Sequence, residues 1–142
     1  MYNQSKTQVS HLSLNKLVES LTPRETNADD YDIKTLMATY ETFTTSLQLI
    51  RKLVERFEVP APVTGNTSQW VINTRNPIQI RVIKIIRLFL EETKIIHPNT
   101  NFLIKLFVRR LMVEEPTMGK HLLKSIRQRV NISNSLPGMT LK

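Results

Sequence analysis

The stretch that decides the fold runs from Asp29 to Pro60 and reads DDYDIKTLMATYETFTTSLQLIRKLVERFEVP. Its apolar residues recur every three or four positions, once before and once after residues 44–46, so each set lies on one face of an α-helix. Thr45 and Gln48 have the spacing of a capping box at the start of the second helix. Pro60 ends that helix, because the residue before a proline disfavours the helical conformation. The pattern predicts a helical hairpin at the centre of the fold.

The rest of the chain shows the same helical periodicity between proline-marked breaks. Seven prolines and only three glycines, with little strand-like alternation, favour helices over a sheet. We therefore expect an all-α fold, a compact bundle of about five to seven helices. The remaining helices are predicted over residues 13–21, 78–93, 100–112 and 117–130. A flexible tail is expected over 1–10, the helical domain over 11–130 and a linker or tail over 131–142, with a long loop at 61–77.

Composition excludes several kinds of chemistry. The 142 residues include no cysteine, so disulfides, thiolate zinc sites and a thiol nucleophile are excluded. His11, His97 and His121 do not have the spacing of metal ligands, and phosphate-binding loops and nucleophile elbows are missing. The sequence predicts no enzymatic activity, no cofactor and no metal site for this chain. Without a membrane-length apolar run or a signal peptide, a cytoplasmic location is expected.

Four sequence blocks between Leu12 and Met112 carry a resemblance, in order and at suitable spacing. The blocks are Leu14-Asn15-Lys16-Leu17-Val18-Glu19-Ser20-Leu21-Thr22, Thr39-Tyr40-Glu41-Thr42-Phe43-Thr44-Thr45, Arg56-Phe57 with Pro60, and Ile80-Arg81-Val82-Ile83-Lys84-Ile85-Ile86-Arg87-Leu88-Phe89-Leu90. Through these blocks the chain is similar to the N-terminal domain of Ras-type guanine-nucleotide exchange factors, the Ras exchanger motif. Three residues depart from the family pattern: Glu41 stands where Arg is common, Ser46 where Pro is common and Phe89 where Trp is usual.

The resemblance implies a structural and regulatory role. In that family a separate catalytic exchange domain of the same polypeptide acts on a Ras-family GTPase, and the N-terminal domain packs on it and stabilises it. In some members the N-terminal domain also contributes to a second Ras site. Such support needs apolar surface left over after the domain's own core is filled. We expect this partner-domain interface at Ile104, Phe107, Val108, Leu111 and Met112, with Leu36 and Tyr40 added.

Charge is concentrated in the second part of the chain. Residues 1–60 hold seven Lys/Arg and eight Asp/Glu, a balance of −1, whereas residues 61–142 hold thirteen and four, a balance of +9. This field suits anionic lipid at the inner face of the plasma membrane, an acidic partner or the phosphates of nucleic acid. The expected basic surface comprises Arg81, Lys84, Arg87, Lys120, Lys124 and Arg127.

Two alternatives to the exchange-factor domain remain open from the sequence. A basic helical nucleic-acid-binding domain is one, although Phe89, Phe102 and Phe107 fall on apolar faces and do not alternate with cations as stacking aromatics do. The other is a stand-alone helical protein-interaction module. A homodimer of the isolated domain is a further expectation, because an uncovered docking surface can pair with itself.

Overall fold

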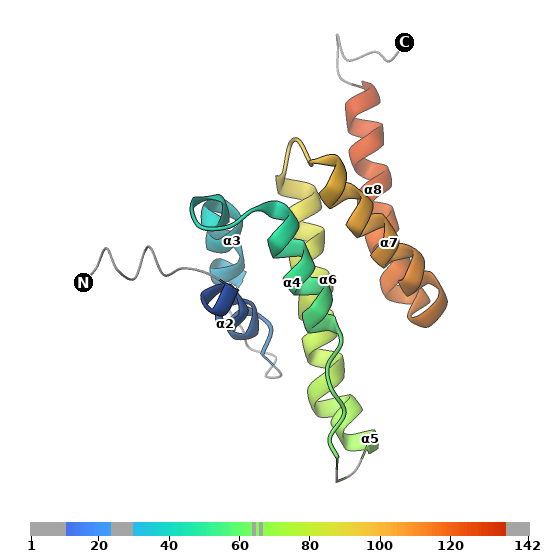
Figure 1. Cartoon of the computed structure of the whole chain (residues 1–142). Helices are drawn as coiled ribbons and strands as arrows, with labels where there is room; N and C mark the ends of the chain where they lie inside the picture. The colour runs from blue at the N-terminus through green and yellow to red at the C-terminus, as the bar shows by residue number, and fades with distance from the viewer. Residues whose placement is uncertain (1–10, 24–29, 64, 66, 136–142) are drawn as a thin grey trace, which may run out of the picture.

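The computed structural model describes residues 11–23, 30–63, 65 and 67–135, and this part of the chain is built of helices without a strand (Figure 1). The all-α prediction is confirmed. The predicted tail at 1–10 lies outside the described residues. The helices are α2 (His11–Leu21), α3 (Asp30–Thr39), α4 (Ser46–Phe57), α5 (Thr67–Trp70), α6 (Asn76–Glu92), α7 (Pro98–Glu114) and α8 (Pro116–Ser135), with a 3-10 turn η1 (Tyr40–Thr42) after α3 and a π-helical turn η2 (Val71–Arg75) before α6.

Helices α4 and α6 form the central column of the molecule (Figure 1). α2 packs on α4 and α3 packs on α6, while α7 and α8 form a second helical pair on the other side. α7 contacts α4, and α8 contacts α6. Both helices predicted over 29–60 are present as α3 and α4, joined through η1, but each packs on α6 and they do not form the central hairpin that was expected. The centre of the fold is instead the pair α4 and α6, which are distant in the sequence.

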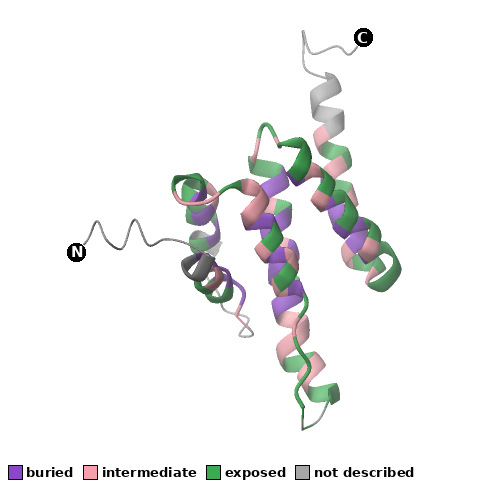
Figure 2. Ribbon diagram, in the orientation of Figure 1, coloured by how far each residue is buried: buried purple, intermediate pink, exposed green. Residues whose placement is uncertain are grey.

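The core follows this column (Figure 2). The side chains of Leu49, Ile50 and Leu53 on α4 are fully buried, and the ring of Phe57 meets that of Phe107 edge-on with centroids 5.1 Å apart. Each fully buried side chain of this size contributes roughly 1.5–3 kcal/mol to burial free energy. α6 is buried on most of its circumference, through Ile78, Gln79, Arg81, Val82, Ile83, Ile85, Ile86, Phe89 and Leu90.

The ends of α4 are both held by side chains. Thr45 is the N-cap, and its hydroxyl oxygen accepts a hydrogen bond from the backbone N–H of Gln48 at 3.2 Å, which is one of the two bonds of the predicted capping box. At the other end, the amide nitrogen of Gln79 donates to the carbonyl oxygen of Phe57 at 3.1 Å. Because the last carbonyls of a helix have no partner inside it, this bond from α6 fixes where α4 stops.

The long loop expected at 61–77 is shorter than predicted, because α5 and η2 continue into α6. Pro77 lies inside this helical segment, although the ring of a proline ordinarily clashes with the carbonyl four residues earlier in an α-helix. The structure avoids the clash with a π turn, in which the N–H of Asn76 bonds to the carbonyl of Val71 five residues before it. The wider turn accommodates the proline, so the chain stays helical from Thr67 to Glu92.

The last two helices begin earlier or end later than predicted. α7 starts at Pro98, two residues before its predicted start at 100, with the proline in its first turn after His97. α8 runs to Ser135, five residues past the predicted end of that helix at 130. Residues 136–142 lie outside the described part. α7 and α8 meet closely at Gly119, where a Cβ atom would lie 2.9 Å from the sulfur and 3.0 Å from the backbone nitrogen of Met112.

Candidate docking surface

Two blocks of the family resemblance meet in space. The guanidinium of Arg56, on α4, donates from Nε to the Thr22 hydroxyl at 3.0 Å and from a terminal nitrogen to the Thr22 carbonyl at 3.1 Å. Thr22 is fully buried, and its hydroxyl donates to the carbonyl of Val18 at 2.6 Å. One arginine therefore completes the end of α2 and ties it to α4.

The three residues that depart from the family pattern lie in different surroundings. Ser46, in the place of the common proline, has its hydroxyl 3.0 Å from that of Thr100, which links the start of α4 to α7. Phe89, in the place of tryptophan, is fully buried with its ring centroid 6.2 Å from that of Tyr40. Glu41 is exposed.

Tyr40 is the buried titratable group of this region, at 4% exposure. Burial raises the pKa of its phenol above the ordinary value of 10.0, and the neighbouring Glu41 carboxylate raises it further. A hydrogen bond with the Thr93 side chain partly offsets this rise. The phenol is therefore a neutral member of the core.

The residues expected to form the partner-domain interface lie mostly inside the domain. Six of the seven are at most 5% exposed, and only Met112 keeps a third of its surface. Their burial corrects the expectation, because a side chain that already fills the core offers no free surface to another domain. The six are Ile104, Phe107, Val108 and Leu111 on α7, Leu36 on α3, and Tyr40 on η1.

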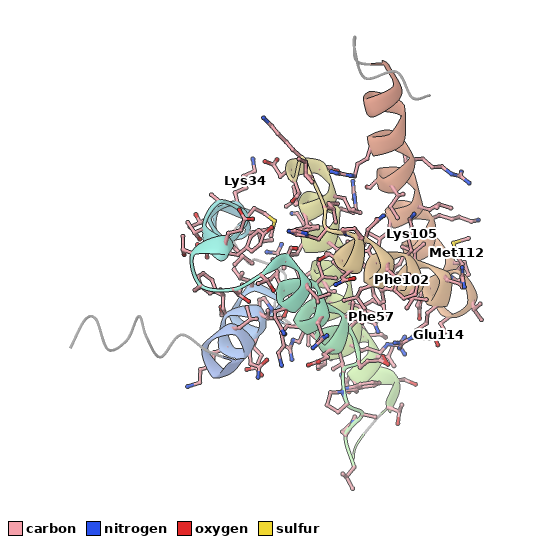
Figure 3. The ribbon with its side chains drawn as sticks, turned by 45° about the horizontal axis from the view of Figure 1, so that its top comes forward. Lys34, Phe57, Phe102, Lys105, Met112 and Glu114 are labelled. Carbon is pink, nitrogen blue, oxygen red and sulfur yellow. The ribbon has the colours of Figure 1, made fainter. Side chains whose placement is uncertain are left out.

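Free apolar surface lies instead on the outward face of α7. Phe102, Leu106 and Val113 are 63%, 43% and 82% exposed, and Met112 adds a smaller apolar surface beside them at 36%. Figure 3 labels Phe102, Lys105 and Met112 along this helix. We call the set Phe102, Lys105, Leu106, Arg109, Met112 and Val113 the α7 stripe; all six are exposed.

A signal for this division was present in the sequence. The two cations Lys105 and Arg109 share the face of Phe102 and Leu106, since positions three and four apart are neighbours on a helix. The opposite face carries no charge at Ile104, Phe107, Val108 and Leu111. The uncharged face is the one that a core accepts, because burying an unpaired charge is costly.

Ion pairs fix the end of α7 next to the stripe. Arg110 pairs with Glu58, just after α4, and its Nε donates to the Glu114 carboxylate oxygens at 3.2 and 3.3 Å. The hydrogen bond with Glu58 is the main cause that raises the pKa of Arg110 above its ordinary value. The pairs are partly exposed, so their contribution to stability is small, but they set the position of α7 relative to α4.

A groove of about 410 Å³ lies beside these ion pairs, lined by residues of the α4 end, α5, η2 and the α7 end. A carboxylate oxygen of Glu115 lies 4.0 Å from the guanidinium of Arg75, which itself lies over the Trp70 ring at 5.9 Å. The charged groups that line the groove thus have partners of opposite sign, and we interpret the groove as a junction between packed helices.

The expected basic surface is divided by the structure. Arg81 is buried at 8% exposure, which corrects its placement on the surface, and Lys84 is half-buried. Arg87 is exposed on α6, and Lys120, Lys124 and Arg127 are exposed on α8. Arg129, further along α8, is not part of this surface, because it donates to the carbonyl oxygens of Leu90, Thr93 and Lys94.

Among the described residues, none of the helices combines the length and the apolar composition of a membrane span, and no three His, Asp or Glu side chains gather as metal ligands would. The five phenylalanines all lie in the described part, and only Phe102 is exposed; it shares its face with Lys105 and Arg109, which corrects the expectation that it lies apart from the cations. Phe89 and Phe107 are core residues, so neither can stack on a base.

Comparison with known proteins agrees with this organisation. The family model of the RasGEF N-terminal motif matches residues 8–111. Ras guanine nucleotide exchange factor J of Dictyostelium discoideum is 41% identical over 88 residues, which cover 62% of this chain and 11% of that protein. Factor G of the same organism is 25% identical over 132 residues, covering 92% of this chain and 8% of that protein. The chain thus spans about a tenth of the length of these relatives, and it belongs to the RasGEF N-terminal motif family.

Proposed function

We propose that this chain is the non-catalytic N-terminal structural and regulatory domain of a Ras-family guanine-nucleotide exchange factor. It packs on a separate catalytic exchange domain of the same polypeptide and stabilises it, in small-GTPase signalling in the cytoplasm. Family membership supports this role, as does the small share of the relatives' length that the chain covers. The observation that carries the proposal is the α7 stripe, where apolar side chains remain uncovered after the core is complete.

The stripe has the chemistry of an interface between domains. Exposed apolar groups that are contiguous along a helix are stabilised when another surface covers them. The cations Lys105 and Arg109 lie among them, so the covering surface is expected to be apolar with carboxylates at its rim. This arrangement favours docking of one defined face over nonspecific adhesion.

A first experiment separates support from catalysis. Release of a fluorescent nucleotide from Ras is measured with and without the 142-residue chain. We expect equal rates, because the proposal assigns the exchange reaction to the catalytic domain. Acceleration of release by the chain alone would show that it is itself an exchange catalyst.

A second experiment tests the stripe within an exchange factor. This chain replaces the matched region of factor J, and nucleotide release by the chimera is measured. The substitution Leu106→Asp is expected to reduce exchange by about tenfold or more, because a charge in a docked apolar interface costs more than 1.4 kcal/mol. Val63→Asp is the matched control, since Val63 is fully exposed in the segment between α4 and α5, and it should leave the rate unchanged.

Two results of that experiment would contradict the proposal. One is a chimera whose rate does not respond to Leu106→Asp, provided that the chimera is active. The other is an equal loss with Val63→Asp, which would indicate a general effect of an added carboxylate.

A further inference from the structure

The last described helix carries charge of one sign only. From Pro116 to Lys142 the chain contains no aspartate or glutamate. α8 presents Lys120, Lys124 and Arg127 to solvent, while Arg129 is occupied with the carbonyls at the end of α6. α8 also lies beyond residues 8–111, which the family model matches, so family membership assigns it no role.

The three exposed cations form a single strip. At 100° per residue, Lys124 and Arg127 lie within about 40° of Lys120 around the helix, and the buried Leu122 lies about 200° away. The strip therefore faces directly away from the core. Lys120, Lys124 and Arg127, with Leu123 and Gln128, line a shallow hollow of about 260 Å³. The cations thus border one shared space, which favours an anionic group between them.

We infer that this α8 strip, defined as Lys120, Lys124 and Arg127, binds the phosphate headgroups of an anionic lipid bilayer. An anionic bilayer presents many phosphates in one plane, so each cation near that plane adds to the attraction. A straight strip of cations about 10 Å long can lie flat against such a plane. α8 has no Phe, Tyr or Trp, so it lacks the large aromatic rings on which the bases of single-stranded nucleic acid stack best. The α6 cations are the weaker candidates, because Arg81 is buried and Lys84 is half-buried.

The inference stands apart from the exchange-factor proposal, since the strip lies on α8 and the docking stripe on α7. Its test is sedimentation of the 142-residue chain with vesicles of phosphatidylcholine containing about 20% phosphatidylserine, at low and at physiological salt. The chain should bind these vesicles and not vesicles of phosphatidylcholine alone. Replacing all three strip cations by Gln should weaken binding by about a hundredfold, at about fivefold per cation.

A matched control has the same loss of charge elsewhere. Lys16, Lys34 and Arg51 are exposed on α2, α3 and α4, and their replacement by Gln also lowers the net charge by three. This control should retain most of the binding. Lys120→Arg with Lys124→Arg should bind as the natural chain does, because charge is kept. Circular dichroism and a thermal melt of each variant establish that its fold is intact.

Four outcomes would overturn the inference. The first is failure of the natural chain to bind the anionic vesicles, and the second is binding to vesicles of phosphatidylcholine alone. The third is an equal loss of binding in the strip and control variants. The fourth is binding to duplex or single-stranded DNA that is stronger than vesicle binding at the same salt and is lost in the strip variant.

Discussion

At the scale of single residues, a side chain of one family motif can contact two helices at once. Arg56 and Thr22 are 34 positions apart, yet their two hydrogen bonds close the end of α2 against α4. Helical periodicity could place each residue on its own helix. It could not predict the bond, because a pairing between distant segments depends on how the helices pack. The resemblance named both residues without giving their contact.

Replacing Arg56 should weaken the contact between α2 and α4 and so lower the stability of the domain. Arg56→Met keeps much of the aliphatic stem but removes both donors to Thr22, whose buried carbonyl and hydroxyl lose partners. We expect the free energy of unfolding to fall by about 1–3 kcal/mol. Urea unfolding followed by circular dichroism measures it. Arg51→Met on the exposed side of α4 should change it by less than about 0.5 kcal/mol, and equal effects of the two substitutions would contradict the assigned role.

Tyr40 gives the domain a dependence on alkaline pH. Folding raises the pKa of its phenol, mainly through burial, so the folded state favours the neutral form. This contribution to stability is complete below the unfolded pKa of about 10 and is lost as pH rises through the higher folded pKa. The free energy of unfolding should therefore decline above about pH 10, and Tyr40→Phe should remove part of that decline. Parallel stability curves for the two proteins between about pH 8 and pH 11 would refute this.

At the scale of helices, the sequence predicted where most of them lie but not what each face contacts. On α7, Ile104, Phe107 and Leu111 lie on one face, while Phe102, Leu106 and Met112 give the opposite face apolar residues as well. Periodicity alone therefore does not say which side is core; the charges of Lys105 and Arg109 are what mark the outward side. The helical turns α5 and η2 were missed for a different reason, because residues 61–77 show no clear apolar periodicity, which is the signal from which the other helices were predicted.

The joint between α6 and α8 rests on Arg129. Its guanidinium donates to carbonyls at the end of α6, at 2.5 Å to Leu90 and 3.0 Å to Lys94, where a cation also interacts favourably with the helix dipole. Arg129→Met should lower the free energy of unfolding by about 1–2 kcal/mol, measured by thermal melting. Arg127→Met, two residues earlier and exposed, should change it by less than about 0.5 kcal/mol. A loss as large at Arg127 as at Arg129 would show that the capping geometry is not what stabilises the joint.

At the scale of the whole molecule, a closed core is combined with an uncovered apolar stripe and a net charge of +8. The two features oppose each other in the isolated chain. Apolar stripes favour pairing of two copies, whereas like charges repel, including Lys105 and Arg109 within the stripe itself. Salt shifts this balance, because it shortens the range of the repulsion from about 10 Å at 0.1 M to about 3 Å at 1 M and leaves apolar attraction in place.

The isolated chain is therefore predicted to be monomeric at low salt and to form a homodimer through the α7 stripe as salt rises. Sedimentation velocity at several protein concentrations, at about 0.05 M and about 0.5 M sodium chloride, measures the two states. Leu106→Asp should keep the chain monomeric at both salt concentrations, whereas Val63→Asp should behave as the natural chain does. A dimer that weakens with salt would mean that ion pairs join the copies, and one that survives Leu106→Asp would place the contact on another face of the molecule.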